Sequence, residues 1–348
     1  MINTALLAEI CKVAGAPGHE QRVREIVLRE VESLVDEIRI DNMGNVVAIK
    51  KGKERKRVMI GAHMDEIGFI VTHIDDKGFV YFHTLGGFDP KTLTAQRVII
   101  HGKEDIIGVM GGKPIHLMNA ADRAKVPTIK DYFIDTGRPK KELDKIISVG
   151  DTITRSSELI EMGDCINCKS LDNRVSVFIL IEMFREMKET PPYDVYGVFT
   201  VQEEIGIRGA NVSSMDINPD FGFGLDTTIA WDTPGSTKQE QVSALGEGAC
   251  IKVMDSATVC DYRMVKYMKE LAKNKKLKTQ LEILPAGGTD TAGIQRMNPG
   301  GSIAGAVSIP TRHIHQSIEM VHKEDVRGAI DLLRHSVENL HTYDWSFR

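Results

Sequence analysis

Aspartate, glutamate and histidine residues follow several short apolar stretches of the sequence, and these residue types bind divalent metal ions. The residues concerned are His63 and Asp65, Glu203 and Glu204, Asp226, and His313 and His315, which come shortly after 58–60, 195–201, 221–225 and 303–309. A further carboxylate, Asp172, stands near the start of another apolar stretch. One such residue alone is common on a protein surface, but recurrence after successive apolar stretches indicates a metal site.

Five of these side chains could together hold two metal ions: His63, Asp172, Glu204, Asp226 and His315. A hydrolytic pair of ions about 4 Å apart needs one shared ligand and an open position for water, so one carboxylate would bridge the ions. Three carboxylates would also offset the repulsion between two divalent cations. Because zinc and cobalt both accept mixed nitrogen and oxygen ligands, we expect two Zn or Co ions per chain.

The spacing within each pair suggests separate roles for its members. His63 and Asp65 share a face of an extended segment, so Asp65 can accept a hydrogen bond from the non-ligating nitrogen of His63 or from neighbouring backbone. Glu203 and Glu204 are adjacent and diverge in extended geometry. One of these two glutamates can therefore bind metal while the other faces the bound water.

The helices and strands expected around these residues alternate along the chain. Helical spacing of apolar residues predicts helices over 3–14, 23–34, 171–188, 264–272 and 326–340, the first one capped by Asn3. Apolar runs predict strands within 39–50, 57–63, 195–201, 221–225 and 303–309. This alternation is typical of an α/β fold with a mainly parallel sheet between helices. In such a sheet the predicted ligands would meet beyond the carboxyl ends of the strands.

Residues 69–164 have a different pattern, with short β-like runs separated by glycines and no long amphipathic helix. We therefore expect a small β-barrel-like domain inserted at 69–164 into an α/β catalytic domain formed by 1–68 and 165–348. The chain of 348 residues has room for two domains at the usual scale of roughly 150 residues each.

The composition excludes several other classes of protein. The chain has 44 Lys and Arg against 49 Asp and Glu, for a net charge of −5, which argues against nucleic acid as the main partner. The N-terminus lacks a signal-peptide pattern, and no uncharged apolar run approaches the roughly 18 residues that would span a bilayer. We expect no membrane association and a cytoplasmic location.

At these motifs the sequence resembles the dinuclear metallo-aminopeptidases typified by glutamyl aminopeptidase, deblocking aminopeptidase and the tetrahedral dodecameric aminopeptidases. Some of these relatives carry the label endoglucanase or cellulase M. The matching stretches are 61–69, 171–174, 201–206, 288–290 and 312–315, together with 86–90, 108–111 and 131–135 in the insert. The resemblance therefore covers nearly the whole chain.

The resemblance implies a zinc-peptidase-like fold, peptide substrates and specific roles for the site residues. One ion would be held by His63 and Asp226 and the other by Glu204 and His315, with Asp172 bridging them and Glu203 as general base. The inserted domain would mediate dimerisation, and the dimers would assemble into a dodecamer.

Two further residues are candidates near this site. His313 stands where relatives have tyrosine, and it can share a face with His315, so both imidazoles are possible ligands; the motif favours His315. Asp290 lies in the turn 287–290 and is a candidate for substrate contact.

We expect removal of N-terminal residues from peptides, with Glu203 taking a proton from water and returning it to the leaving amine. The alternatives are a related carboxypeptidase or deacylase, an endoglucanase, and an inactive metal-binding scaffold. Glycosidases use opposed carboxyls roughly 5 to 9.5 Å apart and normally no metal pair, which disfavours the glucanase. A purely structural metal site would not need Glu203, which disfavours the scaffold.

Overall fold

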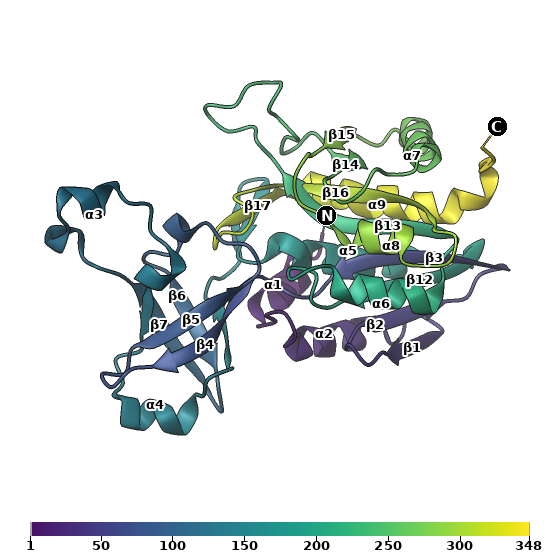
Figure 1. Ribbon diagram of the computed structural model, residues 1–348. Helices are drawn as coiled ribbons and strands as arrows, with labels where there is room; N and C mark the ends of the chain where they lie inside the picture. Colours follow the sequence, from purple (N-terminus) through teal and green to yellow (C-terminus); the bar gives the residue numbers. More distant parts are fainter. Residues whose placement is uncertain (1, 348) are drawn as a thin grey trace.

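The computed structural model describes residues 2–347 and contains a large mixed sheet beside a closed β-barrel (Figure 1). The large sheet has 11 strands. Its continuous path is β1 (Glu37–Ile40), β2 (Val46–Lys50), β12 (Tyr193–Thr200), β3 (Glu54–His63), β13 (Phe221–Ile229), β16 (Ile303–Arg312), β17 (Glu319–His322), β11 (Cys165–Cys168) and β10 (Ile160–Met162). Off this path, β14 (Ala249–Met254) pairs with β16 and with β15 (Thr279–Ile283).

Among the strands of the described residues, the four central strands β12, β3, β13 and β16 pair parallel, as do β14 and β15. The outer strands of the path pair antiparallel, so the predicted α/β class is confirmed, but the expectation of a mainly parallel sheet is corrected to a mixed sheet with a parallel centre. The pairing of β3 with β13 ends at Gly61 and Gly224, although β13 continues along β16 to Ile229. This separation of two central strands leaves room for side chains at their carboxyl ends, where binding sites of open parallel sheets lie.

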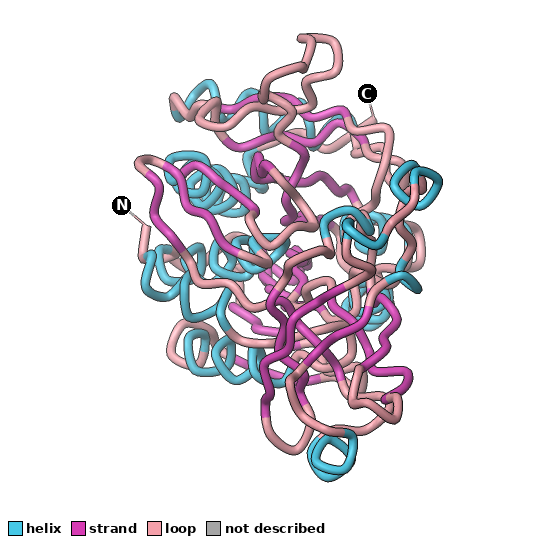
Figure 2. The backbone as a smooth tube through the Cα atoms, turned by 90° about the vertical axis from the view of Figure 1, so that its left-hand side faces the viewer, coloured by secondary structure: helices cyan, strands magenta, loops and turns pink. Residues whose placement is uncertain are grey.

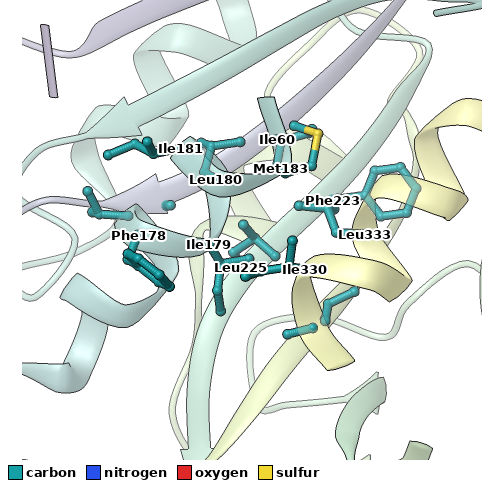
Figure 3. Packing of buried hydrophobic residues seen from close by; sticks show 14 of the residues in the cluster. Ile60, Phe178, Ile179, Leu180, Ile181, Met183, Phe223, Leu225, Ile330 and Leu333 are labelled. Carbon is teal, nitrogen blue, oxygen red and sulfur yellow. The ribbon is translucent and has the colours of Figure 1, made fainter. Parts of the chain in front are cut away.

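Helices cover both faces of the large sheet. One face packs against α1 (Thr4–Lys12), α2 (Gln21–Val31), α5 (Leu171–Glu186), α7 (Tyr262–Lys275) and α9 (Lys323–Asn339), and the other against α6 (Arg208–Ile217) and α8 (Asp290–Arg296). The helix predicted over 171–188 is buried on nearly all sides, and Figure 3 shows its Phe178 and Leu180 in the same core as Phe223 of β13 and Ile330 of α9. The Leu6 N–H donates to Asn3 Oδ1 at 3.2 Å, which confirms the predicted cap of α1.

The barrel has a closed circuit of strands: β4 (Gly68–Ile74), β5 (Val80–Leu85), β8 (Phe133–Asp135), β7 (Asp105–Gly111), β6 (Arg97–His101) and β9 (Thr152–Arg155). It has its own core, which includes Phe69, Ile100 and Ile134. Short helices α3 (Ala120–Ala124) and α4 (Lys140–Ile146) lie in the same segment. Figure 2 views the molecule from the barrel side. The strand β10 falls within the range 69–164 but belongs to the large sheet.

Four short 3-10 segments complete the secondary structure of the described residues: Pro90–Thr92, Ile115–Leu117, Ile129–Asp131 and Leu340–Thr342. Among residues 2–347, no helix combines the length and the apolar character needed to cross a bilayer.

Gly224 allows α8 to pack directly against β13. A Cβ atom at this position would overlap Thr291 Oγ1 and lie 3.1 Å from the Thr291 backbone nitrogen. We therefore expect Gly224→Ala to lower the free energy of unfolding by about 1–3 kcal/mol, measured by urea denaturation, because the helix would have to shift. The matched control is Gly328→Ala in α9, where the nearest atom would be 3.9 Å away and about 0.5–1 kcal/mol of stabilisation is expected. Equal stability of the Gly224→Ala variant and the parent would contradict this packing argument.

Candidate metal centre

The predicted ligands line one cavity of about 750 Å³ at the carboxyl ends of the central strands. The predicted site residues on its wall are His63, Asp172, Glu203, Glu204, Asp226 and His315. They come from the end of β3, the start of α5, the segment after β12, the middle of β13 and the segment after β16. Residues separated by more than 250 positions in the sequence are thus brought to one place.

Asp172 lies between the two imidazoles. Its Oδ1 is 3.4 Å from His63 Nε2, and its Oδ2 is 3.5 Å from His315 Nε2. His63 Nε2 is also 3.8 Å from Asp226 Oδ1, and His315 Nε2 is 3.4 Å from Glu204 Oε2. The donor atoms therefore form two groups that share one carboxylate.

The chemistry of this donor set fits divalent cations. Glu204 Oε1 is buried without a hydrogen-bond partner, so one ligand oxygen has no partner among the described protein groups. Burial raises the pKa of Glu204, and burial with nearby carboxylates raises the pKa of Glu203 and Asp226 well above the usual range. A cation placed between these oxygens would remove the repulsion among them. Three of the candidate ligands, His63, Asp172 and Glu204, have donor atoms that all lie within 4.8 Å of one another.

Both imidazoles hold a proton tightly in the metal-free chain. Burial alone would lower the pKa of His63, but its contacts with Asp172 and Asp65 raise it well above its usual value. The same balance raises the pKa of His315 to about 11, because Asp172 and Glu204 outweigh the effect of burial. Burial opposes ionisation of Asp172, yet its hydrogen bonds to His315 and His63 lower its pKa. A metal ion would have to displace the imidazole protons.

Asp65 hydrogen-bonds the backbone of the two glutamates at the site. Its Oδ1 accepts from the Glu203 N–H at 3.0 Å and its Oδ2 from the Glu204 N–H at 3.1 Å. His63 Nδ1 lies 3.0 Å from the Asp65 carbonyl oxygen, which can only accept, so Nδ1 carries the proton and Nε2 faces the cavity. The Asp65 carboxylate thus accepts from neighbouring backbone, one of the two partners expected for it, while the shorter contact with His63 Nδ1 is made by the Asp65 carbonyl oxygen.

Several residues at or next to the predicted ligands in the sequence have a left-handed backbone conformation. They are Ser170, Gln202, His313 and His315, with φ of 55°, 56°, 60° and 64°. A non-glycine residue in this region costs roughly 1–2 kcal/mol, so the surrounding structure must hold it there. Asp172 also departs from helical geometry, with φ −76° and ψ 103°, so it precedes the regular part of α5.

Two buried carboxylates that the sequence did not reveal stabilise these turns. Glu319 accepts from the N–H groups of Asp172 and His315, each at 2.9 Å. Glu20 accepts from the Gln202 N–H at 3.2 Å. Neither glutamate lies in a metal-ligand motif, and each acts through backbone groups that every residue type offers. In the sequence, only the position of Glu319 four residues after His315 could have indicated its role at the site.

The two remaining candidates differ in position. His313 lines the same cavity, but the ion-pair distances to Asp172 and Glu204 belong to His315. Asp290 is 1% exposed and accepts from Thr200 Oγ1 at 2.5 Å, while its neighbour Thr289 lines the cavity. Asp290 therefore lies behind the wall, which contradicts the predicted substrate contact.

Known proteins resemble this chain over nearly its full length. Residues 44–332 match the family model described as M42 glutamyl aminopeptidase. Lysyl aminopeptidase of Pyrococcus furiosus is 32% identical over 354 residues, covering 99% of this chain and 100% of that protein. Aminopeptidase APDkam598 of Desulfurococcus kamchatkensis has a TM-score of 0.92 at 35% identity, covering 96% of this chain and 94% of that chain. TET1 peptidase of Pyrococcus horikoshii, described as able to assemble into a tetrahedron or a large octahedral shell, has a TM-score of 0.86 at 27% identity, covering 96% and 98%.

Zinc uptake by the metal-free chain at pH 8 should release protons. His63 and His315 have raised pKa values and hold protons at this pH, and each must lose one to bind metal. Zinc affinity should therefore fall as the pH is lowered, because protons compete more strongly. Calorimetric titration in two buffers with different ionisation enthalpies counts the protons, and a His315→Ala variant should release fewer. Binding enthalpies that are equal in the two buffers would contradict the protonation assigned to His63 and His315.

Proposed function

Because the chain belongs to the M42 glutamyl aminopeptidase family, it is a metallo-aminopeptidase, and we propose that it removes N-terminal residues from peptides with two metal ions and Glu203 as general base. The observation that carries this proposal is the position of Asp172, which presents one carboxylate oxygen to His63 and the other to His315. A carboxylate placed between two imidazoles could serve as a shared ligand of two ions.

In this proposal each ion has its own ligands besides the shared Asp172. His63 and Asp226 would hold one ion, and Glu204 and His315 the other, in agreement with the two groups of short distances. Zinc and cobalt both suit this mixture of nitrogen and oxygen donors. When bound, the ions would polarise the scissile carbonyl and lower the pKa of water toward about 7.

Glu203 is the candidate general base because it lines the cavity and the family resemblance assigns the ligand roles to Glu204 and Asp226 instead. Its Oε2 is 3.8 Å from His63 Nε2, and the Asp65 carboxylate fixes its backbone. Burial and the neighbouring carboxylates raise its pKa, which favours holding a proton between two steps. Glu203 would take a proton from the attacking water and return it to the leaving amine.

The family match favours an aminopeptidase over the carboxypeptidase or deacylase, the glucanase and the inactive scaffold. A cytoplasmic location stays a prediction from the sequence.

A homo-oligomer is supported by the solved structures that resemble this chain, one of which is a dodecamer. We propose that the barrel mediates dimerisation and that dimers form a dodecamer. Exposed apolar side chains on the barrel support this role: Ile107 and Val109 on β7, and Ile115 and Leu117 in the segment that follows it. Such side chains are typical of protein contact surfaces.

Glu203→Gln should lower kcat by about 10²–10⁴-fold while leaving the metal content unchanged, because the amide cannot accept the proton from water. The matched comparison is Glu204→Gln, the adjacent substitution, which should reduce the metal content as well. Hydrolysis of an aminoacyl-p-nitroanilide and metal analysis of the purified variants measure both effects. Unchanged turnover in Glu203→Gln would refute the assignment of the base.

Activity should require a free substrate amine and bound metal. A panel of aminoacyl-p-nitroanilides, each free and N-acetylated, would be assayed with metal-stripped protein and after refilling with zinc, cobalt or manganese. We expect cleavage of the free substrates alone, loss of activity on stripping and recovery with a divalent ion. Cleavage of acetylated substrates would point to a deacylase or endopeptidase, and hydrolysis that survives chelation would exclude the metal mechanism.

A further inference from the structure

We propose that Arg155, at the end of barrel strand β9, is a positioning residue for His315, and that the inserted barrel thereby sets the affinity of the metal ion held by His315 and Glu204. This inference rests on the proposed two-ion function. It goes beyond it in assigning part of the metal site to the inserted domain.

The backbone of His315 is held on both sides. Its φ of 64° lies in the left-handed region, which a histidine adopts only when neighbouring groups hold it. The His315 N–H donates to Glu319 Oε1 at 2.9 Å, and Arg155 Nη1 donates to the His315 carbonyl oxygen at 2.9 Å. One hydrogen bond comes from the large domain and the other from the barrel. Loss of either would let the imidazole turn away from Asp172 and Glu204.

Arg155 is suited to hold a fixed direction because the barrel encloses it. It is 3% exposed, and its guanidinium lies 5.6 Å from the ring centre of Phe88. Phe88 in turn stacks on Phe69 of the barrel core, with ring centres 4.4 Å apart. The Arg155 charge opposes the rise that burial causes in the pKa of Glu319. Arg155 Nε and Nη2 are buried without a hydrogen-bond partner among the described protein groups, so the bond from Nη1 to His315 is the hydrogen bond that directs this guanidinium.

The barrel loop that contains Gly86 and Gly87 lies beside Glu204 and His315, the two residues proposed to hold one ion. A Cβ at Gly87 would lie 3.5 Å from His315 Nδ1, and a Cβ at Gly86 would lie 3.4 Å from Glu204 Cβ. The hydrogen bonds given above for His63 come instead from the large domain, through Asp65. The contacts of the barrel with the metal centre therefore concentrate on the position of Glu204 and His315.

A second arginine joins the same two domains and offers a matched control. Arg22 of α2 forms a two-point ion pair with Asp105 of barrel strand β7, at 2.5 and 2.8 Å. Its side chain is 50% exposed and has no contact with His315 among those described. Arg22→Ala therefore weakens the junction between the two domains without removing a hydrogen bond to His315.

The test is a cobalt titration of metal-free full-length protein, followed by visible absorption, for the parent, Arg155→Ala, Arg155→Lys and Arg22→Ala. The parent should take up two ions. In Arg155→Ala the cobalt affinity of one binding step should fall by about 10- to 100-fold, while the affinity of the other step is unchanged. Residues that orient metal ligands typically have effects of this size. Arg155→Lys should restore part of the loss, and Arg22→Ala should behave as the parent. Peptide hydrolysis by Arg155→Ala should recover at cobalt concentrations that refill the weakened position.

The outcomes separate this inference from the proposed function. If the parent binds two ions and Arg155→Ala binds both with parental affinity, Arg155 has no positioning role. An equal loss in Arg22→Ala would attribute the effect to general domain docking and would also overturn the inference. If the parent itself binds fewer than two ions, the two-ion function fails, and the inference fails with it. Melting temperatures of all variants show whether any loss reflects unfolding.

Discussion

The proposed metal centre depends on hydrogen bonds from backbone N–H groups to the side chains of two buried acidic residues. Asp65 holds the N–H groups of Glu203 and Glu204, and Glu319 holds those of Asp172 and His315. Burial strengthens these hydrogen bonds, because the low local dielectric increases the attraction between donor and acceptor. These bonds offset the cost of the left-handed turns that aim the ligands at one point.

The large sheet provides the space in which the site side chains meet. Because β3 and β13 cease to pair at Gly61 and Gly224, the residues that follow can face a cavity instead of a neighbouring strand. Asp226 still lies in the regular pairing of β13 with β16, so its position is set by the sheet itself. The remaining ligands lie at or beyond strand ends and need the supporting carboxylates.

Sequence patterns predicted the long buried helices and the parallel central strands, and missed several shorter elements, among them α6, β14, β15 and α8. The apolar helix over 171–188 and the glycine-punctuated insert were evident, because burial determines both patterns. In contrast, β15 and α8 were not predicted: Leu281 and Ile283 of β15 are exposed, and α8 is seven residues long and contains Gly293. At the site, residue types revealed the ligand candidates. Glu20 and Glu319 remained hidden because their partners are backbone groups, which leave no trace in a motif.

The order of the site residues along the chain has a consequence for biosynthesis. The proposed ligands begin at His63 and end at His315, and Glu319 follows on the short strand β17 near the C-terminus. A nascent chain that has reached residue 300 has the barrel and most of the large sheet, but it lacks β16, His315 and Glu319. Because β16 also completes the parallel centre of the sheet, that centre forms only after β16 has been synthesised. A nascent chain that ends before residue 315 therefore lacks one of the proposed metal ligands.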